Sequence, residues 1–123
     1  MNTIFKLECN LVKLDEVAKK LAKNSNIGDI YLLKGELGVG KTTFARSFIN
    51  SLYDKNNILR PRSIKSPSFP IMINYSMLNY DINHYDLYRL EKHKELLEIG
   101  LYDSLEKNIS IIEWPDLIMN NLI

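Results

Sequence analysis

The amino-acid sequence predicts an α/β fold with a largely parallel sheet. Compact apolar runs alternate along the chain with stretches whose apolar residues recur at helical spacing, an order that places parallel strands beside crossover helices. The chain has 123 residues, a length typical of a single domain spanning 1–123. Its content of 46% hydrophobic and 25% charged residues is that of an ordinary globular domain.

The first half of the chain predicts two strand–helix units. IFKL at 4–7 is typical of a short strand, and a helix is expected at 14–23. DIYLLKG at 29–35 runs without alternation, as a strand buried on both faces does. A second helix is expected from Lys41 to about Leu52. The first helix places four apolar residues at i, i+3, i+4 and i+7, namely Leu14, Val17, Ala18 and Leu21.

The second half begins with a polar loop at 53–69 that carries two prolines. A turn near Asn79 predicts a hairpin, and Gly100 is expected to break the helix that follows the hairpin into two pieces. Pro115 suits the start of a last helix. The predicted elements are a strand at 70–78, its partner at 82–88, the broken helix at 92–107, a strand at 109–114 and a helix at 115–123.

Charge and cysteine content exclude some classes of protein. A net charge of +1 does not indicate a nucleic-acid binder, although a local patch could still bind nucleic acid. Cys9 is the only cysteine, so the chain holds no internal disulfide and no cysteine zinc cluster. No run approaches 18 apolar residues, and MNTIFKLECN lacks a signal-peptide core. We therefore expect a cytoplasmic protein without a membrane partner.

The segment GELGVGKTT carries the strongest functional signal. Gly35, Gly40, Lys41 and Thr42 satisfy the phosphate-loop (Walker A) pattern G-x-x-x-x-G-K-[ST]. The glycines permit a close approach of the backbone, and the start of the next helix presents unpaired N–H groups to phosphate. The alternative is a plain glycine-rich turn. The predicted nucleotide-binding residues are Gly35, Glu36, Leu37, Gly38, Val39, Gly40, Lys41, Thr42 and Thr43.

The side chains of this segment suit a triphosphate with magnesium. Lys41 would reach the β and γ phosphates, the Thr42 hydroxyl would bind Mg²⁺, and Thr43 would touch the α phosphate. The guanine-specific patterns N-K-x-D and D-x-x-G are both absent, which favours ATP over GTP.

Two carboxylates are candidates for the magnesium shell and for orienting water. Glu113 ends the apolar strand SIIEW, so it would emerge at the carboxyl edge of the sheet, where ligands bind in open α/β folds. Asp86 lies within NHYDLYRL. Structural alternatives are a helix-capping acid for Glu113 and a surface carboxylate of a hairpin for Asp86. With Lys41, these two acids are the predicted catalytic residues.

Several neighbouring residues have more than one interpretation. We interpret His84 as a packing or hydrogen-bonding residue rather than a base, and Arg89 as the partner of a carboxylate rather than a charge-stabilising finger. Trp114 is expected to pack, with stacking on a base as the alternative. A mobile loop that senses the γ phosphate is expected at four residues: Ser66, Pro67, Ser68 and Phe69. The basic residues before them are interpreted as solvated, or as contacts for RNA or an acidic partner: Arg60, Arg62 and Lys65.

Four motifs in order resemble the TsaE (YjeE) family: GELGVGKTTFAR, SPSF, HYDLYRL and IIEWPD. The resemblance spans residues from about 14 to 116. It implies a P-loop NTPase-like three-layer sandwich with a mainly parallel central sheet. It also implies a weak Mg²⁺-dependent ATPase that is required for threonylcarbamoyladenosine (t6A37) modification of tRNA. Such a protein acts with TsaD and TsaB and meets tRNA indirectly through that complex.

By motif match, the resemblance assigns magnesium to Thr42, Asp86 and Glu113, and places Asn10 and Leu11 near the adenine. Three departures stand out. Ser68 replaces the family's usual threonine, and the linker before SPSF is long and basic. The family also typically continues past the E-W-P motif with further strands, which this chain is expected to lack. Two alternative functions therefore remain. One is a nucleotide-binding interaction module without turnover, and the other is a small-molecule kinase.

Overall fold

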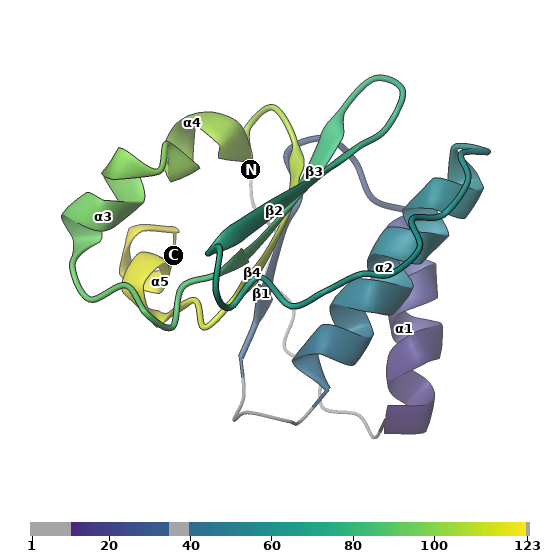
Figure 1. Cartoon of the computed structure of the whole chain (residues 1–123), viewed down its shortest axis with the longest axis horizontal. Helices are drawn as coiled ribbons and strands as arrows, with labels where there is room; N and C mark the ends of the chain where they lie inside the picture. The colour runs from purple at the N-terminus through teal and green to yellow at the C-terminus, as the bar shows by residue number, and fades with distance from the viewer. Residues whose placement is uncertain (1–10, 35–39, 123) are drawn as a thin grey trace.

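The computed structural model describes residues 11–34 and 40–122. Four strands form one sheet in the order β1-β4-β3-β2, and helices lie on both of its faces (Figure 1). In chain order the elements are α1 (Leu11–Lys23), β1 (Ile30–Leu33), α2 (Lys41–Lys55), β2 (Met72–Ser76), β3 (Asp81–Asp86), α3 (His93–Glu98), α4 (Leu101–Leu105), β4 (Ile109–Glu113) and α5 (Asp116–Leu122).

The sheet is parallel across three strands and antiparallel at one edge. β4 pairs with β1 on one side and with β3 on the other, both in parallel. β2 and β3 form the antiparallel hairpin, with Met72 opposite Tyr85 and Ser76 opposite Asp81. β4 is the last of the described strands in sequence, yet it lies between β1 and β3. Because these three strands run parallel, their carboxyl ends meet at one edge of the sheet.

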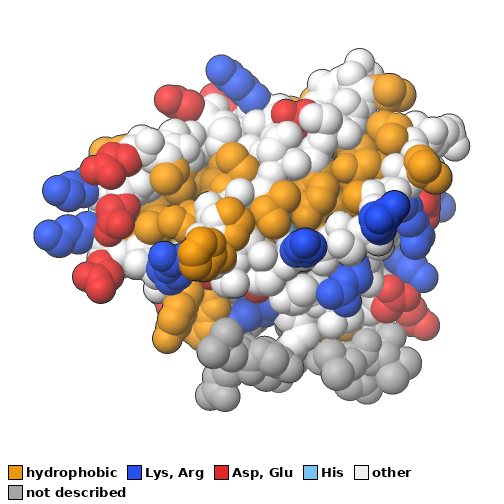
Figure 2. Space-filling view, viewed as in Figure 1, with side chains coloured by type: hydrophobic (Ala, Val, Ile, Leu, Met, Phe, Trp, Pro, Cys, Tyr) orange, Lys and Arg blue, Asp and Glu red, His pale blue; other side chains and the backbone are white. Residues whose placement is uncertain are grey.

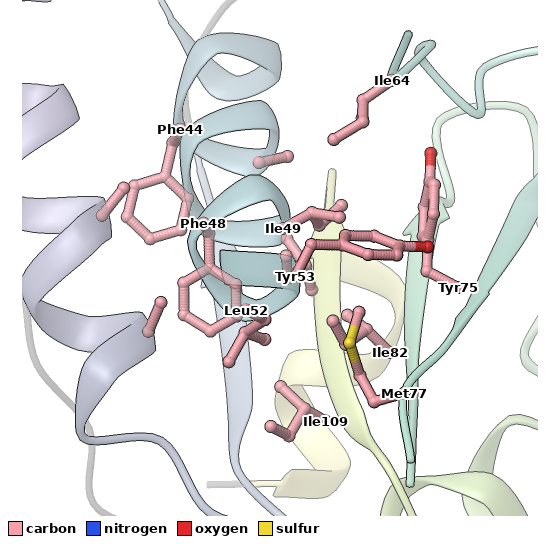
Figure 3. Packing of buried hydrophobic residues seen from close by; sticks show 14 residues of the cluster. Phe44, Phe48, Ile49, Leu52, Tyr53, Ile64, Tyr75, Met77, Ile82 and Ile109 are labelled. Atoms are coloured by element: carbon pink, nitrogen blue, oxygen red, sulfur yellow. The ribbon is translucent and has the colours of Figure 1, made fainter. Parts of the chain in front are cut away.

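The helices α1 and α2 cover one face of the sheet. Figure 3 shows Phe44 and Phe48 of α2 pointing toward α1, while Tyr53 points toward Tyr75 of β2. The Phe48 ring lies 4.7 Å from that of Tyr31 on β1, and 5.9 Å from that of Phe44. These aromatic contacts fill the space between two helices and a strand, so α2 is fixed against the sheet along its length.

The shorter helices α3, α4 and α5 cover the opposite face. Their buried residues form a second core with Tyr85 and Ile112 of the sheet; from the helices these are Leu96, Leu101, Leu105 and Ile118. Gly100 separates α3 from α4 at a φ of 69°, a left-handed conformation that favours glycine. The Glu95 carboxylate accepts the N–H of Lys92 at 3.0 Å, which satisfies an otherwise unpaired donor at the start of α3.

Most predicted elements are confirmed, and the differences lie at their ends. The first helix begins at Leu11 rather than 14, and α2 continues to Lys55, so the loop starts three residues later than expected. Both hairpin strands are shorter than their predicted ranges. The strand predicted at 4–7 lies outside the described residues. In the part of the chain that the structure describes, no helix has both the length and the apolarity needed to cross a membrane.

Shortening Phe48 to alanine should destabilise the fold strongly. Phe48 is fully buried, and removing a buried aromatic ring costs about 3–5 kcal/mol of unfolding free energy. Phe69→Ala is the matched control, because Phe69 is 83% exposed and its loss should cost less than about 1 kcal/mol. Denaturant unfolding of both variants measures the difference. Equal losses would show that the ring of Phe48 does not hold α2 to the sheet.

Candidate functional site

Two buried carboxylates lie side by side at the carboxyl edge of the sheet. Asp86 ends β3, Glu113 ends β4, and the two residues are direct neighbours in the parallel register. Residues paired in this way point to the same face, here the face that α2 covers. Asp86 is 5% exposed and Glu113 is 3% exposed. Because buried acids are costly without charged or hydrogen-bonding partners, this pair makes the edge a candidate functional site.

The start of α2 brings a lysine and two threonines to the same edge. Gly40 precedes the helix at a φ of 98°, which favours glycine, and its carbonyl accepts the N–H of Phe44 at 2.9 Å. A pocket of about 240 Å³ lies between this turn and the acids. Its lining residues are Gly40, Lys41, Thr42, Thr43, Ser66, Ser68, Asp86, Glu113 and Trp114.

Lys41 is held between negative charges and an aromatic ring. Its ammonium lies 3.6 Å from the centre of the Trp114 ring, a cation–π contact. Burial lowers the pKa of Lys41, and the carboxylates of Glu113, Asp86 and Asp116 oppose this effect. The site therefore keeps a lysine close to acids in a poorly solvated place, where electrostatic interactions are stronger than in water.

His84 holds one oxygen of Glu113. The His84 Nε2 atom lies 2.6 Å from Glu113 Oε2, and the histidine is fully buried. His84 Nδ1 has no hydrogen-bond partner among the described residues. The tautomer with hydrogen on Nε2 then donates to the carboxylate and leaves only a lone pair without a partner, the cheaper arrangement. The bond holds Oε2 of Glu113 in place, and Glu113 lines the pocket.

Trp114 follows Glu113 in a strained conformation. Its φ of 54° is left-handed, which is uncommon for a bulky residue and persists only where its surroundings hold it. The ring of Tyr88 packs against it at 4.8 Å. The N–H of Tyr88 also donates to Asp86 Oδ1 at 3.0 Å, so this residue supports both the tryptophan and the second acid.

Arg89 holds the loop opposite the start of α2. Its Nη1 donates to the carbonyl of Phe69 at 3.0 Å, and the guanidinium lies 5.2 Å from the Phe69 ring. The carbonyl of Pro67 accepts the N–H of Ile71 at 2.7 Å. The interpretation that Arg89 pairs with a carboxylate is therefore wrong within the described residues. Its role is to restrain the backbone of the segment that carries Ser66 and Ser68.

The oxygen-bearing side chains of the pocket suit a magnesium ion that also binds phosphate and water, rather than a metal ion held by protein side chains alone. Among the described residues, no group of three or more His, Cys, Asp or Glu side chains could hold a metal ion. Magnesium commonly takes one or two carboxylates together with phosphate oxygens and water. Asp86 and Glu113 supply two adjacent carboxylates, and the hydroxyl of Thr42 lines the same pocket.

The structure brings together most of the predicted site residues that it describes. Lys41, Asp86 and Glu113 share the pocket with Thr42 and Thr43, and Ser66 and Ser68 face it from the loop. The remaining predicted residues divide into two sets. Two residues of the loop do not line the pocket: Pro67, which is buried, and Phe69, which is exposed. Leu11 is the first residue of α1 and does not line the pocket either. Asn10, Gly35, Glu36, Leu37, Gly38 and Val39 lie outside the described residues.

Sequence reasoning foresaw a hydrogen-bonding role for His84 but not its partner. The two residues are 29 positions apart, and their contact follows from the register, which pairs His84 with Ile111, two residues before Glu113. The place of Trp114 over Lys41 was also not foreseen. The available signal was the spacing of His84 and Asp86, because alternate residues of a strand lie on the same face. If Asp86 lies beside Glu113, His84 lies on the face that carries both acids.

Removing His84 alone should cost more stability than removing the whole pair. His84→Leu would leave a buried carboxylate without its partner, at a cost of about 3–5 kcal/mol of unfolding free energy. The double variant His84→Leu/Glu113→Leu should recover most of that loss, because an apolar pair replaces a buried carboxylate together with its hydrogen-bond donor. Thermal or denaturant unfolding of both variants makes the comparison. A double variant less stable than His84→Leu would contradict this account.

Comparisons with known proteins agree on one family. The family described as "Threonylcarbamoyl adenosine biosynthesis protein TsaE" has a sequence model that matches residues 10–123. A curated relative from Rickettsia conorii, named tRNA threonylcarbamoyladenosine biosynthesis protein TsaE, is 40% identical over 107 residues. That match covers 87% of this chain and 58% of the relative. A Bacillus subtilis protein of the same name is 33% identical, over 86% of this chain and 63% of that protein.

A solved structure shares the fold of this chain. The crystal structure of Bacillus subtilis YdiB superimposes with a TM-score of 0.66 at 27% identity, over 94% of this chain and 67% of that one. The chain spans about three fifths of the length of the Rickettsia conorii relative. Since the family model matches nearly all of its residues, the chain belongs to the TsaE family.

Proposed function

We propose that this chain binds ATP with Mg²⁺, hydrolyses it weakly, and so supports threonylcarbamoyladenosine modification of tRNA. Its fold would be a P-loop NTPase-like three-layer sandwich. One observation carries the proposal: Lys41 and Thr42, directly after the glycine-rich segment, share a single pocket with the adjacent carboxylates of Asp86 and Glu113. Phosphate-binding and magnesium-binding groups thereby meet at the carboxyl edge of the sheet, where α/β folds bind ligands.

The residues of the pocket suit in-line attack of water on the γ phosphate. Lys41 would stabilise the charge that develops on the phosphate oxygens. Bound Mg²⁺ would neutralise the phosphates, and Thr42, Asp86 and Glu113 would hold it. His84 and the N–H of Tyr88 each fix one carboxylate oxygen, so the acids enter the reaction already oriented. Such preorganisation avoids the cost of arranging them during the reaction.

Ser66 and Ser68 would report the state of the nucleotide. Both line the pocket from a loop whose backbone is held at Phe69 by Arg89. Order and disorder of such loops commonly follow the presence of the γ phosphate. Hydrolysis would then change the surface that the loop presents to a partner.

TsaD and TsaB are the proposed partners, and tRNA would be met through their complex. The family's described role in threonylcarbamoyl adenosine biosynthesis supports this assignment. The ATP cycle would support turnover of the complex rather than carry out transfer itself. A nucleotide-binding module without turnover remains an alternative. A small-molecule kinase gains little support, because Arg89, the last arginine of the chain, is engaged with loop carbonyls.

Neutralising Lys41 should weaken ATP binding. Lys41→Met removes a charged donor, and a hydrogen bond of that kind contributes about 1.5–3 kcal/mol, or roughly a 10- to 100-fold change in Kd. Lys34→Met is the control, since Lys34 is exposed and pairs with Asp116 at 3.1 Å. Calorimetry with ATP and Mg²⁺ measures both affinities. An unchanged affinity for Lys41→Met would remove the phosphate role of this residue.

Glu113→Gln should separate hydrolysis from binding. Glutamine can still accept the hydrogen bond from His84, but it loses the charge that would hold magnesium and orient water. We expect turnover to fall by about 100-fold or more, with ATP affinity changed only a few-fold. Phosphate release, measured with and without TsaD and TsaB, tests this expectation. Unaltered turnover would exclude Glu113 from the reaction, and transfer of phosphate to an added acceptor would favour the kinase.

A further inference from the structure

Arg89 links the end of β3 to the loop that borders the candidate pocket. Its backbone belongs to a short turn after Asp86, and its side chain reaches back to the carbonyls of Ser68 and Phe69. We call this contact, together with the Phe69 ring, the Arg89 clasp. Of these residues, Ser68 lines the pocket, whereas Arg89 and Phe69 do not. The clasp is therefore placed to act on the pocket through the loop.

The turn that carries Arg89 is fixed to both acids of the pocket. The N–H of Leu87 donates to the carbonyl of Glu113 at 3.1 Å, and the N–H of Tyr88 donates to Asp86 Oδ1 at 3.0 Å. The side chain of Leu87 is buried in the second core. The backbone of Arg89 thus has a set position relative to the two carboxylates, and its side chain passes that position on to the loop.

The part of the loop that Arg89 holds is a closed turn. The N–H of Ile71 donates to the carbonyl of Pro67 at 2.7 Å, and the carbonyl of Ile71 accepts the N–H of Asp86 at 2.9 Å. Pro67 is buried, whereas residues 68–70 between the two ends are exposed. These bonds hold the ends of the turn. The exposed residues between them depend on a further contact to keep one conformation.

Arg89 supplies that contact. Its Nη1 donates to the carbonyl of Phe69 at 3.0 Å and lies 3.5 Å from the carbonyl of Ser68, while the guanidinium lies 5.2 Å from the centre of the Phe69 ring. A planar guanidinium can donate in its plane and stack its face on a ring, which an ammonium cannot do. The ring is 83% exposed, so burial does not hold it. In Figure 2, hydrophobic side chains lie exposed beside Lys and Arg side chains on the face that the loop between α2 and β2 crosses in Figure 1.

We propose that Arg89 is a positioning residue, which holds Ser68 against the nucleotide pocket and thereby sets the rate of ATP hydrolysis. The inference rests on the proposed function, because the reaction assigned to the pocket is the one that the Ser68 hydroxyl would serve. Arg89 acts through the loop, since its guanidinium is engaged with loop carbonyls and does not line the pocket. A displacement of about 1 Å in a catalytic site can lower a rate about 100-fold, so even a modest restraint on Ser68 matters.

A clasp and an arginine finger predict different results. A clasp restrains the loop before ATP arrives, so its loss changes the loop of the nucleotide-free chain. A finger acts only on the charge that develops in the transition state. Loss of a finger would leave the nucleotide-free loop unchanged and lower kcat about 1000-fold or more.

Hydrogen–deuterium exchange of the nucleotide-free chain tests the clasp without any activity. Arg89→Ala should speed exchange of the Ile71 amide about five-fold or more, read from peptides that span residues 66–72, because the turn opens more often. Arg89→Lys should give an intermediate rate, since an ammonium keeps a donor but cannot also stack on the ring. Arg62→Ala is the matched control. It removes the same charge from an exposed position of the same loop and should leave this exchange unchanged.

Steady-state hydrolysis of ATP, measured with TsaD and TsaB, tests the consequence for the reaction. Arg89→Ala should lower kcat about 10-fold and change KM for ATP less than about three-fold, because the loop and not the nucleotide loses its support. Arg89→Lys should recover part of kcat, and Arg62→Ala should change neither constant. Phe69→Ala is a second test that leaves the arginine in place. It removes the ring and keeps the carbonyl bond, so exchange and kcat should change in the same directions but by less.

Each outcome decides between the roles. Unchanged exchange in Arg89→Ala would overturn the clasp, and a 1000-fold loss of kcat beside it would make Arg89 a finger. Faster exchange with unaltered kcat would also overturn the proposal, since the position of the loop would not limit the reaction. Equal effects of Arg62→Ala would reduce the role to charge.

The same measurements separate this inference from the proposed function. An unmodified chain that binds no ATP, or does not hydrolyse it, would refute the proposed function and the positioning role with it. The exchange rates would still show whether Arg89 holds the loop. Turnover by the unmodified chain with no effect of Arg89→Ala would refute the positioning role alone. Circular dichroism of each variant verifies that it remains folded.

Discussion

The parallel pairing of β3 with β4 is the constraint on which the site depends. It sets Asp86 beside Glu113, and it also places His84 diagonally behind the glutamate on the same face. A slip of one residue in either strand would turn one carboxylate to the opposite face of the sheet, away from α2. The relative positions of the two carboxylates and of His84 are thus fixed by strand register.

This arrangement places three ionisable side chains where burial makes a charge energetically unfavourable. Lys41, Asp86 and Glu113 are each less than one tenth exposed. Each has a specific compensation: the lysine faces acids and the Trp114 ring, Asp86 accepts from Tyr88, and Glu113 accepts from His84. The compensations come from residues next to the acids in sequence or in the sheet. The stability of the fold and the proposed activity would therefore depend on the same contacts. The left-handed φ of Trp114 is supported by two of these neighbours, Tyr88 and Lys41.

The sequence was informative wherever a signal was local. Apolar runs predicted the strands, helical spacing predicted α1 and α2, and Gly100 predicted the break between α3 and α4. Helix ends were harder to predict: Tyr53 continues the apolar stripe of α2, but Asp54 and Lys55 carry no apolar signal for the last residues of the helix. The order of the strands was beyond reach, because nothing local places β4 between β1 and β3. For the same reason the motifs indicated which residues would meet, but not that His84 would hold Glu113 or that Arg89 would hold loop carbonyls.

The long loop between α2 and β2 contributes to the candidate pocket. It is fixed to the fold at Ile64 and Pro67, which are buried, while Arg62 and Phe69 on either side are exposed. A segment fixed at two points can change between them without unfolding the domain, because its anchors keep their burial. Ser66 lies in that interval and lines the candidate pocket. A nucleotide bound there, as proposed, would therefore meet the loop at the part that can move while both anchors stay in place.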